Sequence, residues 1–194
     1  MKTLQYILCI LCISSSFLGN AQKFDKLDKS PMDRAYYPSK AAKRTFIKSE
    51  AKKAEAAPVI RVTYSRPSKK GREIFGKMLK YGEAWRIGAN ESTEVLFMTD
   101  VVFGGTPVKA GRYSLLVIPT ENEWVLKLNT ELDGWGNYGY DTSKDIASIS
   151  APVQKGGKVV EHLSMALYEA SENVIHLKIG WDTSSAEFPI RLKR

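Results

Sequence analysis

The feature that most constrains this chain is a series of short segments, from Val59 onward, in which apolar side chains occur at every second residue. Ile60, Val62 and Tyr64 share one face of the first segment, and Phe188 and Leu192 lie on one face of the last. A period of two places such side chains on one face of a β-strand. About eight segments of this kind follow one another with turn signals between them, as in antiparallel sandwiches. We therefore expect an all-β fold, an antiparallel β-sandwich of about eight strands over residues 58–194.

Turn signals divide these segments. Strand-forming residues run from 94 to 103, and both faces of residues 112–118 are apolar, which is typical of a strand covered on both sides. Glycine, proline and short polar residues predict turns at three places: 104–107, 156–157 and, as a hairpin loop between the last two strands, 182–184.

The first 21 residues have the pattern of a signal peptide. Lys2 precedes a short apolar stretch from Leu4 to Ile13, and Gly19-Asn20-Ala21 forms a cleavage site. The apolar stretch is too short for a transmembrane anchor. Cys9 and Cys12, the two cysteines of the chain, both lie here. We therefore expect an exported protein, periplasmic or secreted, whose mature chain has no cysteine and no disulfide.

Residues 22–57 differ from the domain that follows. Residues 22–38 are polar but include large apolar side chains such as Phe24 and Leu27, so we expect an extended strap that lies partly along the domain surface. Residues 39–57 are rich in Ala, Lys and Glu, which favour helix, with Phe46 and Ile47 as the main apolar anchors. This segment is predicted to be a short helical or flexible linker, ended by Pro58.

Positive charge is concentrated where the domain begins. The chain has a net charge of +8, and residues 61–86 hold eight basic and two acidic residues, whereas the rest of the domain is net negative. Such a stretch suits an anionic ligand or surface, although a solvated basic loop explains it equally well. The chain carries no recognised nucleic-acid-binding motif, and nucleic acid is not an expected partner.

The long connection between the first two predicted strands, Tyr64–Thr93, is the main candidate site. Its side chains offer the planar, positively charged guanidinium groups of arginine, an aromatic face and hydrogen-bonding groups: Arg66, Arg72, Trp85, Arg86, Asn90 and Glu91. The alternative is structural. The arginines would then pair with nearby glutamates such as Glu73, Trp85 would belong to the core, and Asn90 and Thr93 would cap the backbone.

A second, glycine-rich loop at residues 131–145 offers a possible aromatic surface through Asp133, Trp135, Tyr138 and Tyr140. Aromatic rings on such loops are common where sugars bind, and a packed surface loop is the structural alternative. The spacing of its aspartates does not fit a calcium-binding EF-hand loop. No metal site and no cofactor are predicted.

No catalytic residue is predicted, because the chain contains neither HExxH nor GxSxG. One catalytic alternative remains open. A pair of carboxylates, for instance Glu91 with Asp133, would serve a hydrolase of the glycosidase type if the fold brought the two together.

Five runs occur in order along the chain: YSRP, KGREIFG, YGEAWRIGANEST, KAGRYSLLVIP and EWVLKLN. Together they resemble the exported Gram-negative bacterial family catalogued as domain of unknown function 2911, and the resemblance covers Lys23–Leu192. It implies a signal peptide and a mainly β domain, with no established activity or ligand and therefore no catalytic residues to carry over. Its signature includes five of the candidate residues named above: Arg66, Arg72, Trp85, Arg86 and Asn90.

These observations lead to one functional expectation with two alternatives. We expect a non-catalytic module that binds a glycan or an anionic envelope molecule through residues 64–93. The alternatives are a structural or interaction protein that uses the N-terminal strap, and a carboxylate-based hydrolase. No oligomeric state is predicted.

Overall fold

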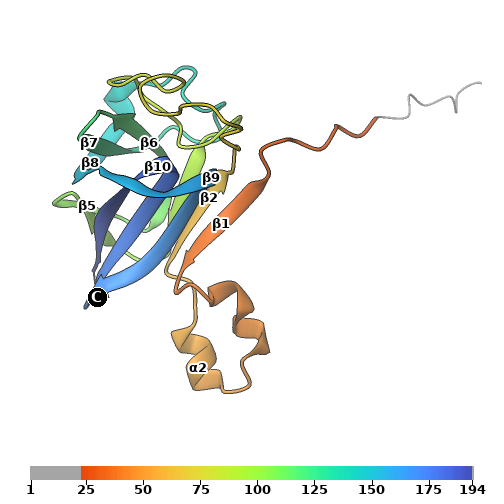
Figure 1. Ribbon diagram of the computed structural model, residues 1–194. Helices are drawn as coiled ribbons and strands as arrows, with labels where there is room; N and C mark the ends of the chain where they lie inside the picture. The colour runs from red at the N-terminus through yellow and green to blue at the C-terminus, as the bar shows by residue number, and fades with distance from the viewer. Residues whose placement is uncertain (1–22, 194) are drawn as a thin grey trace, which may run out of the picture.

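The structure is a computed structural model that describes residues 23–193, and it contains two antiparallel β-sheets (Figure 1). The larger sheet has the strand order β1-β2-β3-β6-β7-β8, and the smaller has the order β5-β4-β10-β9. The sandwich predicted from the sequence is confirmed, with ten strands. The predicted signal peptide and both cysteines lie outside the described residues. The strands are β1 Met32–Tyr37, β2 Ile60–Ser65, β3 Thr93–Phe97, β4 Val101–Phe103, β5 Thr106–Val108, β6 Gly111–Pro119, β7 Glu123–Asn129, β8 Asp145–Pro152, β9 Gln154–Ser171 and β10 Val174–Leu192.

The core lies between the two sheets and is filled by the alternating apolar residues. Ile60 and Val62 of β2 and Leu177 and Phe188 of β10 belong to this core, and all four are fully buried. Burying a side chain of this size stabilises the fold by roughly 1.5–3 kcal/mol. Packing between the sheets is therefore sufficient to explain a sandwich without disulfides.

The sequence misplaced several strand boundaries. The predicted 94–103 strand is two strands, β3 in the large sheet and β4 in the small one. The predicted turns at 156–157 and 182–184 are wrong, because both lie inside the long strands β9 and β10. Gly156 and Asp182 have positive φ there, and the β9–β10 register shifts on either side of Asp182. Between the pairs Asp182–Val160 and Ser184–Lys155, β9 carries three more residues than β10, and this bulge-like irregularity does not end either strand. The turn at 104–105 is confirmed.

The N-terminal strap follows the domain only in its second half. Strand β1 pairs antiparallel with β2, from Met32 opposite Ser65 to Tyr37 opposite Ile60. The first residues of the strap extend away from the sandwich (Figure 1), and Phe24 and Leu27 are 100% and 98% exposed.

Two short helices follow the strap: the 3-10 helix η2 Ala41–Phe46 and the α-helix α2 Glu50–Glu55. Ser49 caps α2, because its side chain accepts a hydrogen bond from the backbone N–H of Lys52. Phe46 was expected to anchor this segment but is 84% exposed, and Ala41 is its buried residue. Among residues 23–193, no helix has the length and apolar character needed to cross a membrane.

The two long loops lie at the same end of the sandwich, away from the C-terminus (Figure 1). One is the connection between β2 and β3. The other joins β7 to β8 and includes the 3-10 helix η3 Thr142–Lys144. All the side chains proposed from the sequence as ligand contacts therefore come from one end of the molecule.

Candidate functional site

The β2–β3 connection is anchored in the core, although it has no strand of its own. Ile74 and Ile87 are fully buried, and Trp85 is 5% exposed. The backbone N–H and C=O of Trp85 each form a 2.8 Å hydrogen bond with Val117 of β6. This anchoring fixes the loop as part of the fold, and it places the residues on either side of Trp85 at the rim.

Trp85 belongs to an aromatic cluster. Its ring stacks on Trp181 of β10 with centroids 5.8 Å apart, and it meets Phe75 and Trp124 edge-on. Such pairs favour the buried state beyond the area that they cover. Sequence analysis considered Trp85 either as an open stacking face or as a core residue. In the structure its ring packs within the protein, and the residue, 5% exposed, borders a cavity.

A cavity of about 450 Å³ opens between the two loops. Such a volume is within the range of roughly 300–1,000 Å³ that small-ligand sites occupy. Apolar groups from Met78, Leu79 and the two indoles contribute one part of the lining. Charged and amide groups contribute the other: Arg72, Lys80, Glu83, Arg86 and Asn137. Three cations and one carboxylate leave the lining net positive.

Arg72 is held in place by the loop that carries it. Its Nε donates to the carbonyl of Lys69 at 2.8 Å, and its Nη2 donates to the carbonyl of Ser68 at 2.5 Å. The sequence suggested glutamate partners for this arginine, but the partners are backbone carbonyls. Carbonyls do not neutralise the guanidinium, so Arg72 keeps its full charge at the cavity while its orientation is fixed.

Arg86 joins the two loops. Its Nη1 donates to the Asn137 side-chain carbonyl at 3.2 Å, and its guanidinium carbon lies 5.7 Å from the centre of the Tyr138 ring. Asn137 in turn donates to the carbonyl of Ala84 at 3.1 Å. Among the residues described, the buried Nε of Arg86 has no hydrogen-bond partner. Within residues 23–193, the guanidinium of Arg86 therefore has one long hydrogen bond to the protein and one buried nitrogen whose hydrogen bond is not satisfied.

Arg66 has a different role. Its Nε, Nη1 and Nη2 donate to the carbonyl of Leu163, to the carboxylate of Asp33 and to the hydroxyl of Ser164, at 2.8–3.0 Å. It does not line the cavity. These contacts join β1, β2 and β9, so Arg66 is an internal clamp, the structural alternative considered from the sequence.

Asn90 and Glu91 also lie away from the cavity. Asn90 has a φ of +62° and follows Ala89, whose backbone N–H and C=O both bond to the Ser65 hydroxyl at 2.6 Å. Glu91 lines a separate surface hollow of about 270 Å³.

That hollow brings together the two carboxylates named as a catalytic alternative, Glu91 and Asp133, with Glu94 beside them. Asp133 is, however, ion-paired with Arg112, whose Nη2 lies 2.6 Å from its carboxylate, and this pairing raises the pKa of Arg112. Glu94 lies 3.5 Å from the same guanidinium. Arg112 thus engages two of the three carboxylates of this hollow, Asp133 and Glu94, in ion pairs.

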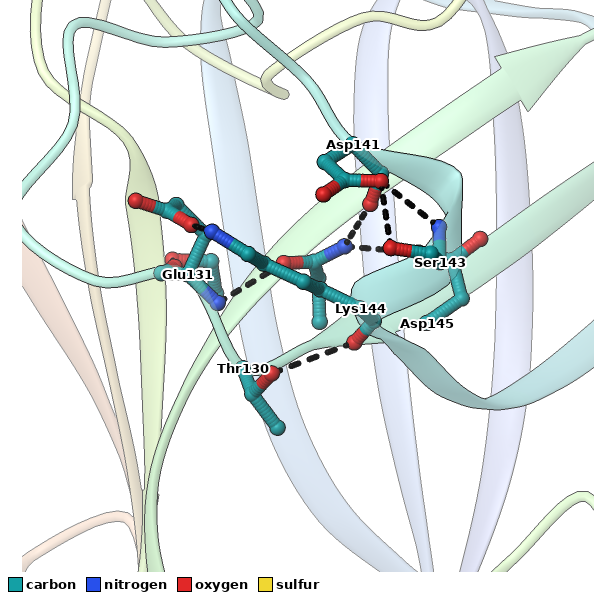
Figure 2. Close-up of polar contacts among 8 residues, drawn as sticks. Thr130, Glu131, Asp141, Ser143, Lys144 and Asp145 are labelled. Carbon is teal, nitrogen blue, oxygen red and sulfur yellow. Dashed lines mark hydrogen bonds and ion pairs between the residues drawn. The ribbon is translucent and has the colours of Figure 1, made fainter.

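The aromatic loop is closed at its base by a polar network (Figure 2). Asp141 accepts hydrogen bonds from the backbone N–H and hydroxyl of Ser143 at 2.9 and 2.7 Å, which lower the pKa of Asp141. Lys144 pairs with Glu131, and the hydroxyl of Thr130 donates to the carbonyl of Lys144 at 3.4 Å. The loop is therefore packed at its base and exposed at its tip, where Trp135 and Tyr138 are 57% and 75% exposed.

Tyr140 is part of this base. Its hydroxyl donates to Asp145 at 2.6 Å, and burial together with this carboxylate raises the pKa of Tyr140. Asp133, Asp141 and Asp145 thus have different partners, which are Arg112, Ser143 and Tyr140. In the part of the chain that the structure describes, no three His, Cys, Asp or Glu side chains gather to hold a metal ion.

Ser68 and His162 form a pair that the sequence did not predict, with the Ser68 hydroxyl 2.9 Å from Nδ1 of His162. The two residues also form an isolated antiparallel β-bridge. Cross-strand neighbours of this kind bring their side chains together as a matter of geometry. We therefore interpret the pair as a link between the β2–β3 loop and β9, and not as a nucleophile with its base.

Three of the six main candidates line the cavity: Arg72, Trp85 and Arg86. Sequence reasoning missed Lys80, Glu83, Asn137 and Trp181, which complete it. The charge of Lys80 and Glu83 was visible in the sequence, but nothing local indicated that Asn137 and Trp181 would face the same space.

Comparison with known proteins gives one match. The model of a family described as "Protein of unknown function (DUF2911)" matches residues 47–190. No curated protein and no solved structure matches the chain.

Proposed function

The chain belongs to the DUF2911 family, whose description assigns no activity, and on that premise we propose that it is an exported, non-catalytic module that binds a small anionic, sugar-like ligand in the cavity between its two long loops. The observation that carries the proposal is the contrast between Arg66 and Arg86. All three nitrogens of Arg66 bond to the protein, whereas Arg86 has one hydrogen bond of 3.2 Å and a buried Nε without a partner among the described residues.

Unpaired hydrogen-bonding groups of a buried or half-buried arginine are costly, and native structures rarely keep them without a purpose. Arg86 and Arg72 are positioned on the same cavity. A ligand carboxylate or another oxyanion there would gain charge-assisted hydrogen bonds from both guanidinium groups.

The rest of the lining favours a ligand with both polar and apolar faces. Met78, Leu79 and the indole edges offer apolar contact, while Asn137 offers an amide. Sugar rings present hydroxyl groups at their edges and C–H groups on their faces. The exposed ring of Tyr138 beside Arg86 adds an aromatic surface near the same place.

The test compares glucuronic acid with glucose, which lacks its carboxylate, by isothermal titration calorimetry. Arg86→Met and Arg72→Met are each expected to weaken binding of the uronic acid about tenfold or more, the loss typical of one charge-assisted hydrogen bond. Arg191→Met removes the same charge from an exposed position of β10 and is the matched control. Equal affinities of the three variants for the uronic acid would refute the proposal, as would a lack of binding across a broader panel of acidic and neutral glycans.

Export is part of the proposal and rests on the pattern of residues 1–21. It predicts that the chain, produced with this segment in a bacterial host, is recovered outside the cytoplasm with Gln22 as its first residue. Mass spectrometry of the fractionated protein measures this directly. A cytoplasmic chain that still begins at Met1 would contradict it.

A second candidate function is association with a partner protein through the strap. Its support is the complete exposure of Phe24 and Leu27 on a segment that extends from the sandwich. A chain beginning at Ser30 tests it by light scattering and by capture experiments on envelope extracts. The candidate fails if the shortened chain has the same association state and the same partners as the chain that begins at Gln22.

A further inference from the structure

A second hollow adjoins the cavity. It has a volume of about 310 Å³ and is lined by Lys29, Ser30, Pro67, Ser68, Lys70 and Arg72. Three of these residues, Ser30, Pro67 and Arg72, also line the 450 Å³ cavity. The two hollows are therefore neighbours, and Arg72 stands between them. We call the second hollow the cationic groove.

The groove is more strongly positive than the cavity. Lys29, Lys70 and Arg72 contribute three cations, and no carboxylate is part of its lining. Within residues 23–193, neither Lys29 nor Lys70 has an ion-pair partner for its ammonium group. Lys69, by contrast, is already paired, because its Nζ lies 3.2 Å from Asp182. The Glu161 and Asp28 carboxylates lie at the backbone N–H groups of Lys70 and Ser30, at 2.8 and 2.6 Å, and form no ion pair with the groove's ammonium groups. Those groups remain open to a bound anion, which would gain their attraction.

The loop that forms the groove is rigidly built. Residues 69–72 form a tight turn, closed by a 3.1 Å hydrogen bond from the N–H of Arg72 to the carbonyl of Lys69. Lys70 and Gly71 at its centre have φ values of +51° and +71°. The N–H of Lys70 is held by the Glu161 carboxylate at 2.8 Å, and the Arg72 guanidinium is held by two loop carbonyls. The backbone of the turn and the Arg72 guanidinium are therefore held in place before a ligand binds, and they lose little conformational entropy on binding.

We propose that the cationic groove and the cavity form one two-part site, and that its ligand is a sugar bearing a phosphate group. The sugar ring occupies the cavity beside Arg86 and the apolar lining. The phosphate occupies the groove, where Lys70 and Lys29 supply charge and Ser30 supplies a hydroxyl group, while the Ser68 hydroxyl stays with His162. Arg72 contacts both parts. This inference rests on the proposed function and adds the chemical class of the ligand.

Phosphate fits the groove better than a carboxylate does. A phosphate monoester carries close to two negative charges at neutral pH and presents three acceptor oxygens. Three cations and the Ser30 hydroxyl group can satisfy that number of acceptors, whereas a carboxylate would leave several of these donors unused.

Calorimetry with glucose, glucose 6-phosphate and inorganic phosphate tests the two parts separately. Glucose 6-phosphate is expected to bind at least tenfold more tightly than glucose. Lys70→Met should remove most of that difference and leave the affinity for glucose unchanged. Arg86→Met should weaken both sugars, and Arg72→Met should weaken glucose 6-phosphate most. Lys158→Met, at another exposed lysine, is the matched control.

An amide NMR titration with inorganic phosphate locates the groove independently of any sugar. The signals of Lys70, Gly71 and Arg72 should shift and saturate, and Lys70→Met should abolish the effect. If Lys158→Met weakened glucose 6-phosphate as much as Lys70→Met, the gain would come from overall charge and the two-part site would be refuted.

The remaining outcomes separate this inference from the proposed function. If Arg86→Met weakened the binding of both sugars while Lys70→Met changed neither affinity, the ligand site in the cavity would be supported and the phosphate subsite would be refuted. If Lys70→Met weakened glucose 6-phosphate and Arg86→Met changed nothing, the groove would bind anions by itself. The proposed function and the two-part site would then both be wrong.

Discussion

At the scale of single residues, the arginines of one basic stretch have different roles. Arg66 bonds to Leu163 and Ser164, which lie 97 and 98 positions further along the chain. Arg86 reaches Asn137, which is 51 positions away. The sequence identified these arginines as unusual, because their concentration is a local property. It could not tell a satisfied guanidinium from an available one, since that depends on partners that only the folded chain brings close.

Gly136 is expected to control Arg86. A Cβ at this position would lie 2.1 Å from Cδ of Arg86, and the φ of Gly136 is +71°. Gly136→Ala should displace the Arg86 side chain and lower the affinity for an anionic sugar about tenfold, because the guanidinium leaves the cavity. Calorimetry with glucuronic acid measures this.

Gly139→Ala is the control for this substitution. It adds the same methyl group to the same loop at a φ of +77°, where nothing lies within 4 Å. Its affinity for the ligand should match that of the unaltered chain. Equal losses in the two variants would show that the loop backbone, and not Arg86, is the sensitive element.

At the scale of elements, alternation predicted β2, β3 and β7 correctly, because buried and less buried residues alternate along most of their length, and the apolar run of β6 matches its burial on both faces. It failed at β9 and β10. A glycine or aspartate with positive φ has the same sequence signature in a turn and in a β-bulge, and only the neighbouring strand decides which one forms. The true hairpin turn at Glu172-Asn173 has an asparagine at positive φ, a signal that the sequence did contain.

The β4–β5 hairpin should depend on Gly104 far more than on Gly105. A Cβ on Gly104 would lie 1.8 Å from the carbonyl oxygen of Ser148 in β8, whereas one on Gly105 would meet nothing within 4 Å. Both glycines have positive φ, so each alanine carries a backbone cost of about 1 kcal/mol. Because of its steric clash, Gly104→Ala should lower the free energy of unfolding by a further ~2 kcal/mol or more. Urea denaturation measures both variants, and equal destabilisation would show that the hairpin moves away from β8 freely.

Glu187 is expected to make stability depend on pH. It accepts hydrogen bonds from Lys178 at 2.8 Å and from Tyr168, and it lies 3.4 Å from His176. These contacts, led by that of Lys178, lower the pKa of Glu187 to about 2, from 4.5 in the unfolded chain. A lowered folded-state pKa means that the stabilisation is complete above pH 4.5 and is lost as the pH falls toward 2.

Glu187→Gln should therefore cost about 1 kcal/mol at pH 7, and this difference should shrink between pH 4.5 and 2. Urea denaturation across this range measures it. Glu172→Gln, at an exposed glutamate of the same hairpin, is the control and should show no such trend. A constant difference between Glu187→Gln and the unaltered chain would contradict the predicted role of ionised Glu187.

At the scale of the whole molecule, the two long loops lie at one end of the sandwich (Figure 1), and they supply most of the residues that line the cavity and the cationic groove. The β2–β3 loop also holds most of the concentrated positive charge. The sequence predicted this polarity, because the basic residues are contiguous. It did not predict that the aromatic loop would close one side of the same cavity. Strand order places the β7–β8 loop beside the β2–β3 loop, and a sandwich allows several strand orders for the same set of strands.

The strap should divide into two parts with different contributions to stability. A chain that begins at Ser30 loses only exposed side chains such as Phe24 and should unfold at the same temperature as the chain that begins at Gln22. A chain that begins at Pro38 also loses β1, its hydrogen bonds to β2 and the ion pair of Asp33 with Arg66. It should be destabilised by at least ~2 kcal/mol. Calorimetric unfolding measures both, and equal stabilities would show that β1 adds nothing to the fold.

The tryptophan cluster gives the molecule an optical property of its own. Trp85, Trp124 and Trp181 are buried with ring centroids 5.8 and 6.5 Å apart, while Trp135 is exposed at the tip of its loop. Indoles this close exchange excitation energy, so the three should emit as one spectroscopic unit that iodide does not quench, and Trp135 should emit separately at longer wavelength. Because two members of the unit border the cavity, the protein carries an internal fluorophore that reports an occupant without a label.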